Sequence, residues 1–345
     1  MSGSSTDRRR REVPLLAALS LGIALLLPLT ALSQERSVTV TAAPIKSFDP
    51  NVSLNRFGGL TYVGGFSYSS RDRRLAGVSA IRLLDGRSRF LAVTDTGYWF
   101  SGAIARDATG RPTGFDSTEI APIHGPDGKP QTQKKGLADA EGLAVDGTRA
   151  VVSFERNHRI EAFAKADHPA DSLPKTIAQP IPLKELRGNA GIETIAVDPG
   201  GEDRQRRTVI VSEQSIDKDG NLFAAILGPA GSIFKVVRQI PWSVTDGAFL
   251  PGGDLLLLER RYQGFGRIGM RIRRIAGTEI RPGALVDGPV LMEADFSQQI
   301  DNMEGLDVSV GADGRTYLAL VSDDNGSIFQ RNLYLEFVLD SPGPS

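Results

Sequence analysis

A β-hairpin pattern recurs along this chain and constrains the fold more than any other feature. Each repeat has an apolar strand that opens on an acidic or polar residue, a tight turn, and a second apolar strand that ends on a carboxylate. The opening residues are Ser79, Glu141, Glu193, Asp246 and Glu304. The closing residues are Asp95, Glu155, Glu213, Glu259 and Asp323. Repetition of one supersecondary unit predicts a repeat architecture.

The turns and the spacing of the hairpins indicate what kind of repeat this is. Turns such as Asp146-Gly147 and Gly252-Gly253 contain residues that tolerate or preset the dihedral angles of tight turns. Successive openings are 52–62 residues apart, which leaves room for a four-stranded blade and its loops. We therefore predict an all-β β-propeller of five or six blades. We expect a strand within residues 57–68 to pair into the last blade and close the ring.

The sequence predicts three segments, at residues 1–33, 34–54 and 55–340. In the first, a basic cluster at Arg8–Arg11 precedes an apolar run and small residues, which is typical of a cleaved export signal. An uncleaved membrane anchor is the alternative, because the apolar run is close to the length that spans a bilayer. We expect an extended lead-in, then the propeller, in a periplasmic or secreted protein that has no membrane attachment after cleavage.

Composition excludes several classes of site. The 40 basic and 41 acidic side chains give a net charge of −1, which argues against nucleic acid as a partner. The chain has no cysteine, so disulfides, a thiol nucleophile and thiolate metal ligands are excluded. Its three histidines share no metal-ligand spacing. A small molecule is the expected partner, and the oligomeric state is left open.

The acidic residues of the hairpins predict a metal site. In an antiparallel hairpin the start of the first strand lies beside the end of the second, so radially packed hairpins would bring these acids to one rim. Like charges at short range raise each other's pKa, and a divalent cation relieves this. Oxygen ligands without His or Cys favour Ca²⁺ over Mg²⁺. The predicted metal ligands are Asp139, Glu141, Glu193, Asp246 and Glu304. For any single acid, solvation or pairing with a neighbouring arginine is the alternative.

Three motifs carry a resemblance to a known family. The run Leu137–Val145, with Val93–Gly97 and Asn302–Leu306, resembles the phytase-like family, described by esterase-like activity of phytase. The resemblance covers roughly residues 55–340 and implies a β-propeller of exported bacterial proteins that hydrolyse phosphate esters. The acidic positions of the family's motifs correspond to Asp95, Asp139, Glu141, Glu155, Glu193, Glu213 and Glu304. The chain lacks the D-A-D-D-P-A-type run of alkaline β-propeller phytases and a dense Lys/Arg cleft, which argues against phytate itself.

These features lead to one main hypothesis, a metal-dependent hydrolase of phosphate monoesters. The candidate general bases are Glu155, Glu213 and Glu259. The residues expected to contact substrate are Arg156, Arg260, Arg261 and Asp95. Hydrolysis of lactones or carboxylic esters by the same ion is the nearest enzymatic alternative. A non-catalytic propeller that binds a ligand or a protein, with a structural Ca²⁺, is the other, because the fold alone does not decide.

Overall fold

The structure is a computed structural model of the chain. It describes Met1 and residues 36–133, 135–228, 231–264 and 267–340. The predicted export signal, residues 1–33, lies outside the described residues except for Met1. Within the described ranges, no helix is long and apolar enough to cross a membrane. The account below concerns the compact unit that begins at Arg36.

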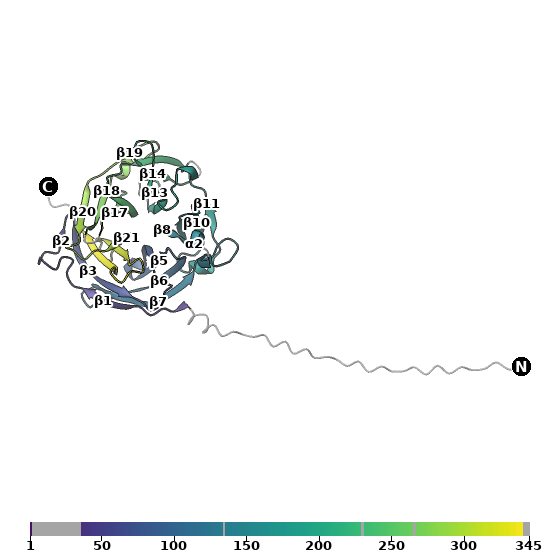
Figure 1. The fold of residues 1–345 in the computed structure, drawn as a ribbon, viewed down its shortest axis with the longest axis horizontal. Coiled ribbons are helices and arrows are strands. Elements are labelled where there is room, and N and C mark those ends of the chain that lie inside the picture. Colours follow the sequence, from purple (N-terminus) through teal and green to yellow (C-terminus); the bar gives the residue numbers. More distant parts are fainter. Residues whose placement is uncertain (2–35, 134, 229–230, 265–266, 341–345) are drawn as a thin grey trace. The chain divides into compact units, whose positions relative to one another are not determined.

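Five sheets, antiparallel except for one short added strand, surround a central axis and form the blades of a β-propeller (Figure 1). Blade 1 contains β4 (Val78–Leu84), β5 (Arg89–Thr94), β6 (Tyr98–Arg106) and β7 (Pro112–Pro122). Blade 2 contains β8 (Ala140–Asp146), β9 (Arg149–Phe154), β10 (Arg159–Phe163) and β11 (Lys175–Ile177). Blade 3 contains β12 (Ile192–Asp198), β13 (Arg207–Ile216), β14 (Leu222–Ile226) and β15 (Ser232–Val236), to which β19 (Leu285–Val286) adds in parallel.

The last two blades complete the ring. Blade 4 contains β16 (Ser243–Phe249), β17 (Leu255–Tyr262), β18 (Ile268–Ile275) and β20 (Val290–Asp295). Blade 5 contains β21 (Asn302–Val310), β22 (Thr316–Asp323), β23 (Asn332–Leu339), β3 (Leu60–Ser69), β1 (Thr41–Ile45) and β2 (Arg56–Phe57). The described helices are short: α2 (Lys135–Ala138) and the 3₁₀ turns η1 (Asp85–Arg87), η2 (Gln131–Gln133), η3 (Pro169–Asp171), η4 (Leu183–Glu185) and η5 (Gly277–Glu279).

The two ends of the propeller close the ring within blade 5. Strand β3 pairs antiparallel with β23 over Leu60–Tyr68 and Asn332–Leu339, so the first long strand of the unit lies between the last strand and β1. Because β3 pairs along the free edge of β23, the last strand of the propeller is not left as an exposed edge strand. The predictions of an all-β propeller, and of closure by an N-terminal strand, are confirmed, with five blades. Part of the expected lead-in pairs as β1, the outermost strand of this sheet.

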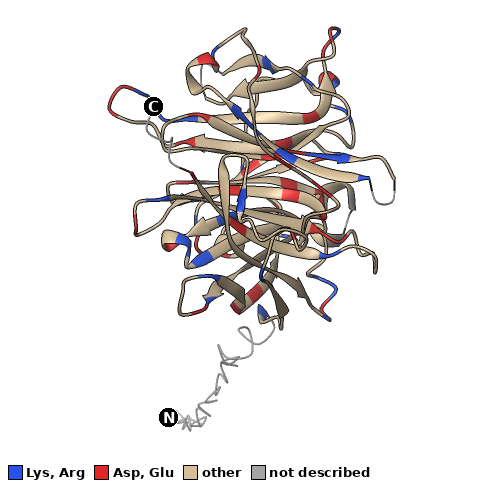
Figure 2. Cartoon of the chain, turned by 90° about the vertical axis from the view of Figure 1, so that its left-hand side faces the viewer, with Lys and Arg blue, Asp and Glu red and all other residues tan. Residues whose placement is uncertain are grey.

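The apolar core lies between blades, because each sheet is covered on both faces. In β17, Leu256 and Leu258 belong to one buried cluster, whereas Leu255 and Leu257 belong to another. Successive side chains of a strand point to opposite faces, so a continuous run of leucines fills the spaces on both sides of blade 4. On the side shown in Figure 2, acidic and basic positions are interspersed, in agreement with the near-zero net charge.

A register shift at the start of each inner strand positions the site. In four blades the shift leaves one residue of the inner strand unpaired, and in blade 2 it leaves two. From blade 1 to blade 5 these unpaired residues are Ser79, Glu141-Gly142, Glu193, Thr245 and Glu304. A bulge redirects the side chain of its extra residue. The glycines that follow two of the glutamates allow neighbouring blades to approach. A Cβ atom on Gly142 would lie 2.4 Å from the Glu193 carbonyl oxygen, and one on Gly305 would lie 3.2 Å from the Ala80 Cα atom.

Arg82 of β4 lies across the centre of the propeller and joins several inner strands. Its guanidinium donates to both carboxylate oxygens of Asp246, at 2.8 and 2.9 Å, and to the backbone carbonyl oxygens of Leu306 and Ile195. Both members of the Arg82–Asp246 pair are buried. The corresponding positions of blades 2, 3 and 4 are alanines, which leave space for this one long side chain; they are Ala144, Ala196 and Ala248.

We expect loss of the Arg82 side chain to destabilise the propeller strongly. Arg82→Met leaves Asp246 buried without its partner, and breaking a buried ion pair typically lowers the free energy of unfolding by about 3–5 kcal/mol. Urea unfolding measures the change. The double variant Arg82→Met/Asp246→Asn should recover part of the loss, because Asp307, which lies 3.9 Å from the Arg82 side chain, is then the one buried carboxylate among the partners of Arg82 left unpaired. Equal stability of wild type and Arg82→Met would contradict this role.

Candidate functional site

The acidic residues of the repeats meet at one mouth of the central channel. We call this site the acidic mouth. It has a volume of about 190 Å³. Its lining residues are Ser79, Asp95, Asp139, Glu141, Glu155, Arg156, Asn189, Glu193, Glu213, Arg260, Glu304, Asp323 and Asn325. The bulged residues of the inner strands and the residues at the ends of the second strands supply most of them, so residues far apart in sequence share one small space.

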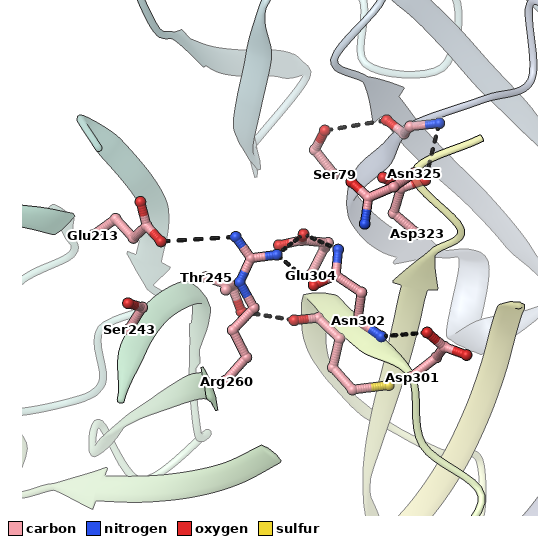
Figure 3. Close-up of polar contacts among 12 residues, drawn as sticks. Ser79, Glu213, Ser243, Thr245, Arg260, Asp301, Asn302, Glu304, Asp323 and Asn325 are labelled. Atoms are coloured by element: carbon pink, nitrogen blue, oxygen red, sulfur yellow. Dashed lines mark hydrogen bonds and ion pairs between the residues drawn. The ribbon is translucent and has the colours of Figure 1, made fainter. Parts of the chain in front are cut away.

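Blade 4 departs from the acidic pattern at both of its positions. Thr245 occupies the bulge, and its hydroxyl donates to the Met303 carbonyl oxygen. Arg260 takes the place that carboxylates hold in the other blades. In blade 4 the residue before the bulge pairs with Glu259, and Arg260 is the next residue, just as Asp323 follows Ser322 in blade 5. Figure 3 shows the Arg260 guanidinium between Glu213 and Glu304. Blade 4 therefore contributes a cation to a mouth that the other blades make acidic.

The two arginines that line the mouth are paired with its acids. Arg260 forms an ion pair with Glu304 and lies 3.7 Å from a Glu213 carboxylate oxygen. It also donates to the Asn302 side-chain oxygen at 2.5 Å. Arg156 pairs with Asp139 and donates to Asn189 at 2.7 Å. Arg156 has a positive φ of 57°, so its backbone adopts a left-handed conformation at the rim. Among the described residues, these two arginines line the mouth against eight carboxylates.

Burial and mutual repulsion raise the pKa values of several of these acids. Burial, followed by repulsion from neighbouring acids, raises the pKa of Glu141 and of Glu193 well above the ordinary value. Burial also raises the pKa of Glu155 to about 7 although the Gly191 backbone N–H donates to it. For Glu304 burial raises the pKa to about 7, and Arg260 opposes that rise. Burial raises the pKa of Asp323 to about 6.

Three of the acids are arranged closely enough to share one cation. Asp139, Glu141 and Glu155 each offer a carboxylate oxygen, and these oxygens lie within 4.8 Å of one another. Asp139 precedes β8, Glu141 lies on its bulge, and Glu155 follows β9 of the same blade. The donor set is oxygen only, which suits a hard divalent cation. A cation in this group would also neutralise the charge that raises the pKa values.

The structure brings most of the predicted site residues together and leaves three outside the mouth. The predicted residues that line it are Asp95, Asp139, Glu141, Glu155, Arg156, Glu193, Glu213, Arg260 and Glu304. Those outside are Asp246, Glu259 and Arg261.

The structure places Asp246, a predicted metal ligand, outside the acidic mouth because of a shift of one residue in register. Asp246 pairs with Leu258, as Thr194 pairs with Val211, so it follows the bulge instead of occupying it. Its carboxylate lies deeper in the channel against Arg82 and accepts from the Leu306 backbone N–H at 2.9 Å.

Glu259 was predicted as a base and Arg261 as a substrate contact. Both are neighbours of Arg260 in the chain, but their side chains lie outside the mouth. Glu259 is buried within blade 4, where it accepts from Arg271 at 2.6 Å and Arg273 at 2.7 Å. Arg261 lies over the Trp242 ring, 4.8 Å from its centroid, and 3.8 Å from Glu293. Side chains alternate along a strand, so only one of these three consecutive residues faces the mouth.

Four further residues line the mouth but were not predicted as site residues, namely Ser79, Asn189, Asp323 and Asn325. Ser79 opens the first hairpin of the repeat and Asp323 closes the last, so the pattern marked both positions without assigning them a role in the site. The two asparagines lie in loops, at positions that the repeat does not mark. Asn325 has a positive φ of 49°, which an asparagine tolerates better than most residues.

Comparison with known proteins identifies the family. Residues 73–326 match the family described as Phytase-like, esterase-like activity of phytase. The chain belongs to this family. The predicted family assignment is thereby confirmed, and the matched span includes every residue that lines the acidic mouth of this phytase-like protein. No curated protein matches the chain.

Several solved structures resemble this phytase-like protein at low sequence identity. A calcium-binding protein, regucalcin, from Agrobacterium tumefaciens C58 has 15% identity and a TM-score of 0.40, over 85% of this chain and 94% of that one. A putative oxidoreductase (glucose dehydrogenase) from Thermus thermophilus has 13% identity and a TM-score of 0.33, over 86% and 100% of the two chains. The Dos1 propeller has 9% identity and a TM-score of 0.33, over 84% and 78%.

The raised pKa values predict how the metal-free protein responds to pH. Glu155 and Glu304 have a folded pKa of about 7 against an ordinary value of 4.5. Between about pH 4.5 and 7 the folded state therefore binds more protons than the unfolded state. The stability that these groups contribute is complete below about pH 4.5 and is lost as the pH rises through about 7. We expect the urea midpoint of chelator-treated protein to fall from about pH 5 to about pH 8.

Added Ca²⁺ should reverse this loss at about pH 8, because it offsets the charge of the ionised acids. A urea midpoint that rises steadily with pH in the chelated protein would contradict the account. The double variant Glu155→Gln/Glu304→Gln should show a weaker pH dependence than wild type over the same range.

Proposed function

We propose that this protein is an exported, metal-dependent ester hydrolase that acts on phosphate monoesters. The observation that carries the proposal is the convergence of buried and half-buried carboxylates from four blades on one mouth, where burial and mutual repulsion raise the pKa values of Glu141 and Glu193. A structural role alone would not require such a costly arrangement at the end of a channel. Perturbed acids gathered in a cleft are typical of functional sites, and the family description gives an ester-hydrolysing activity.

Asp139, Glu141 and Glu155 would hold the cation, with Glu193 and Glu304 as further oxygen ligands in the same mouth. Ca²⁺ fits this set better than Mg²⁺, because it accepts six to eight oxygen ligands in flexible geometry, whereas Mg²⁺ demands a near-ideal octahedron. A bound divalent cation would supply Lewis acidity and lower the pKa of a nearby water molecule. This assignment moves Glu155 from the predicted role of base to that of ligand.

Glu213 is the best-placed general base. It lines both the acidic mouth and the larger pocket beside it, so its carboxylate lies between the cation ligands and the space open to a substrate. In the proposed reaction Glu213 takes a proton from water, and the water oxygen bonds to phosphorus. The bond between phosphorus and the ester oxygen breaks, and the departing alcohol oxygen receives the proton that Glu213 took from water. Arg260, which lines both spaces, would offset the negative charge on the phosphoryl oxygens.

Hydrolysis of carboxylic esters or lactones is the second candidate. The observation that favours it is the shortage of free positive charge, since both arginines of the mouth are already paired with acids. A carboxylic ester is neutral in its ground state and needs less compensation than a phosphate dianion. The same base and the same arginine would serve it, with attack at carbon instead of phosphorus.

We expect Glu141→Gln to abolish metal-dependent activity. The change removes one ligand charge from the group Asp139, Glu141 and Glu155 while keeping the size of the side chain, so we expect a loss of Ca²⁺ affinity and at least about a 100-fold loss of kcat. The measurement is turnover of phenyl phosphate, phenyl acetate and a γ-lactone by residues 34–345, with chelator and with added Ca²⁺. Glu202→Gln is the matched control, because Glu202 is exposed in the loop after the far end of β12.

The pattern of activity separates the candidates. Ca²⁺-dependent turnover of phenyl phosphate that is lost in Glu141→Gln supports the proposal, and turnover of only the acetate or the lactone supports the second candidate. No turnover of any substrate, together with a Ca²⁺-dependent rise in melting temperature, would overturn both in favour of a non-catalytic binding propeller.

A further inference from the structure

A second and much larger cavity, which we call the side pocket, opens beside the acidic mouth. Its volume is about 930 Å³, against about 190 Å³ for the mouth. Its walls come from β13 of blade 3, from the loop before β16, and from β16, β17 and β18 of blade 4. The start of β21, the segment that precedes it and the loop that joins β22 to β23 complete the walls. Glu213, Arg260 and Asn325 line both cavities, so the two spaces meet at these side chains.

Large apolar side chains are exposed around the side pocket. Ile240, Tyr262, Phe296 and Phe329 line it with exposed fractions of 77%, 72%, 58% and 80%. They come from four different segments, the loop before β16, the end of β17, the turn after β20 and the loop after β22. Single exposed apolar residues are ordinary, but several gathered around one cavity mark a binding site for apolar groups.

The side pocket also contains a cation that the described residues leave unpaired. Arg238 lines the pocket, and no described carboxylate lies within ion-pair distance of it. Its guanidinium donates only to the Gln214 side-chain oxygen, at 3.3 Å, and its buried Nε atom has no hydrogen-bond partner among the described residues. A half-buried guanidinium with an unused donor is suited to bind a carboxylate or phosphate of a ligand.

The sizes of the two cavities limit what each can bind. About 190 Å³ holds a cation and the reacting group of an ester but not an aromatic ring as well. A drug-sized ligand typically occupies a cavity of about 300–1,000 Å³, which matches the side pocket. Arg260 lies at the junction, so a ligand with its ester group at Arg260 would place its remaining atoms in the side pocket, which Tyr262 and Arg238 both line.

We propose that the substrate of the acidic mouth is an amphiphilic ester with an aryl-sized apolar body. The body binds in the side pocket against Tyr262 and Phe329, and an anionic substituent on it binds to Arg238. This inference rests on the proposed function for the reacting group and adds the substrate class. It excludes densely charged polyphosphates as preferred substrates, because the side pocket combines apolar and neutral polar side chains with two carboxylates, Glu213 and Asp301, and offers one unpaired arginine among the described residues, where such ligands need many cations.

The test compares three substrates that share the reacting group: methyl phosphate, phenyl phosphate and 4-carboxyphenyl phosphate. With Ca²⁺ present, kcat/KM should be at least about tenfold higher for phenyl than for methyl phosphate after correction for leaving-group reactivity, and higher again for the carboxylated ester. Tyr262→Ala should reduce the phenyl-over-methyl ratio about tenfold. Arg238→Gln should remove the added preference for the carboxylate. Leu173→Ala, which truncates an exposed leucine outside the pocket, should leave both ratios unchanged.

A binding measurement separates failure of this inference from failure of the proposed function. Calorimetry of the Ca²⁺-loaded protein compares methylphosphonate, phenylphosphonate and 4-carboxyphenylphosphonate, which resist hydrolysis. Binding of the aryl compounds that is at least about tenfold tighter than that of methylphosphonate, and is weakened in Tyr262→Ala, supports the inference even if no ester is hydrolysed. Equal or absent binding of the three, or ratios of kcat/KM that Tyr262→Ala does not change, would overturn it, even in an active hydrolase.

Discussion

The structure depends on one electrostatic constraint, the repulsion among carboxylates that a five-bladed ring brings to one desolvated mouth. Glu193 is buried and Glu141 half-buried beside other acids, and their pKa values lie well above the ordinary range because of desolvation and this repulsion. The two arginines of the mouth offset only part of eight acidic side chains. The remaining charge is the strongest physical argument for a bound cation, because neutralisation by protons alone would make the site depend steeply on pH.

The ring is not symmetric, and its asymmetry defines the site. Blade 1 supplies Arg82 to the channel below the mouth, where alanines of three blades leave it room, and this arginine neutralises Asp246. Blade 4 supplies Arg260 to the mouth itself, where the other blades supply acids. Arg260 also lines the side pocket, so this pocket opens next to the arginine of blade 4. The three acids that lie closely enough to share a cation thus come from blade 2, whereas the side chains that line both cavities, Glu213, Arg260 and Asn325, come from blades 3 to 5.

The repeat in the sequence was sufficient to predict the propeller and the meeting of its acids, because hairpin ends are fixed by strand pairing. It was not sufficient at Asp246, since a bulge shifts the register by one residue and Asp-Gly at 246–247 resembles Glu-Gly at 304–305. Nor did it separate Glu259 from Arg260, whose side chains point to opposite faces of one strand. The side pocket was beyond reach, because Ile240, Phe296 and Phe329 lie in loops whose positions no repeat encodes.

The most direct measurement is a crystal structure of residues 34–345 grown with Ca²⁺ at about pH 8, with anomalous data to identify the ion. The account predicts an anomalous peak in the acidic mouth, about 2.3–2.6 Å from carboxylate oxygens of Asp139, Glu141 and Glu155. Density for water alone at this position, with the three carboxylates turned apart or paired only with Arg156 and Arg260, would contradict it.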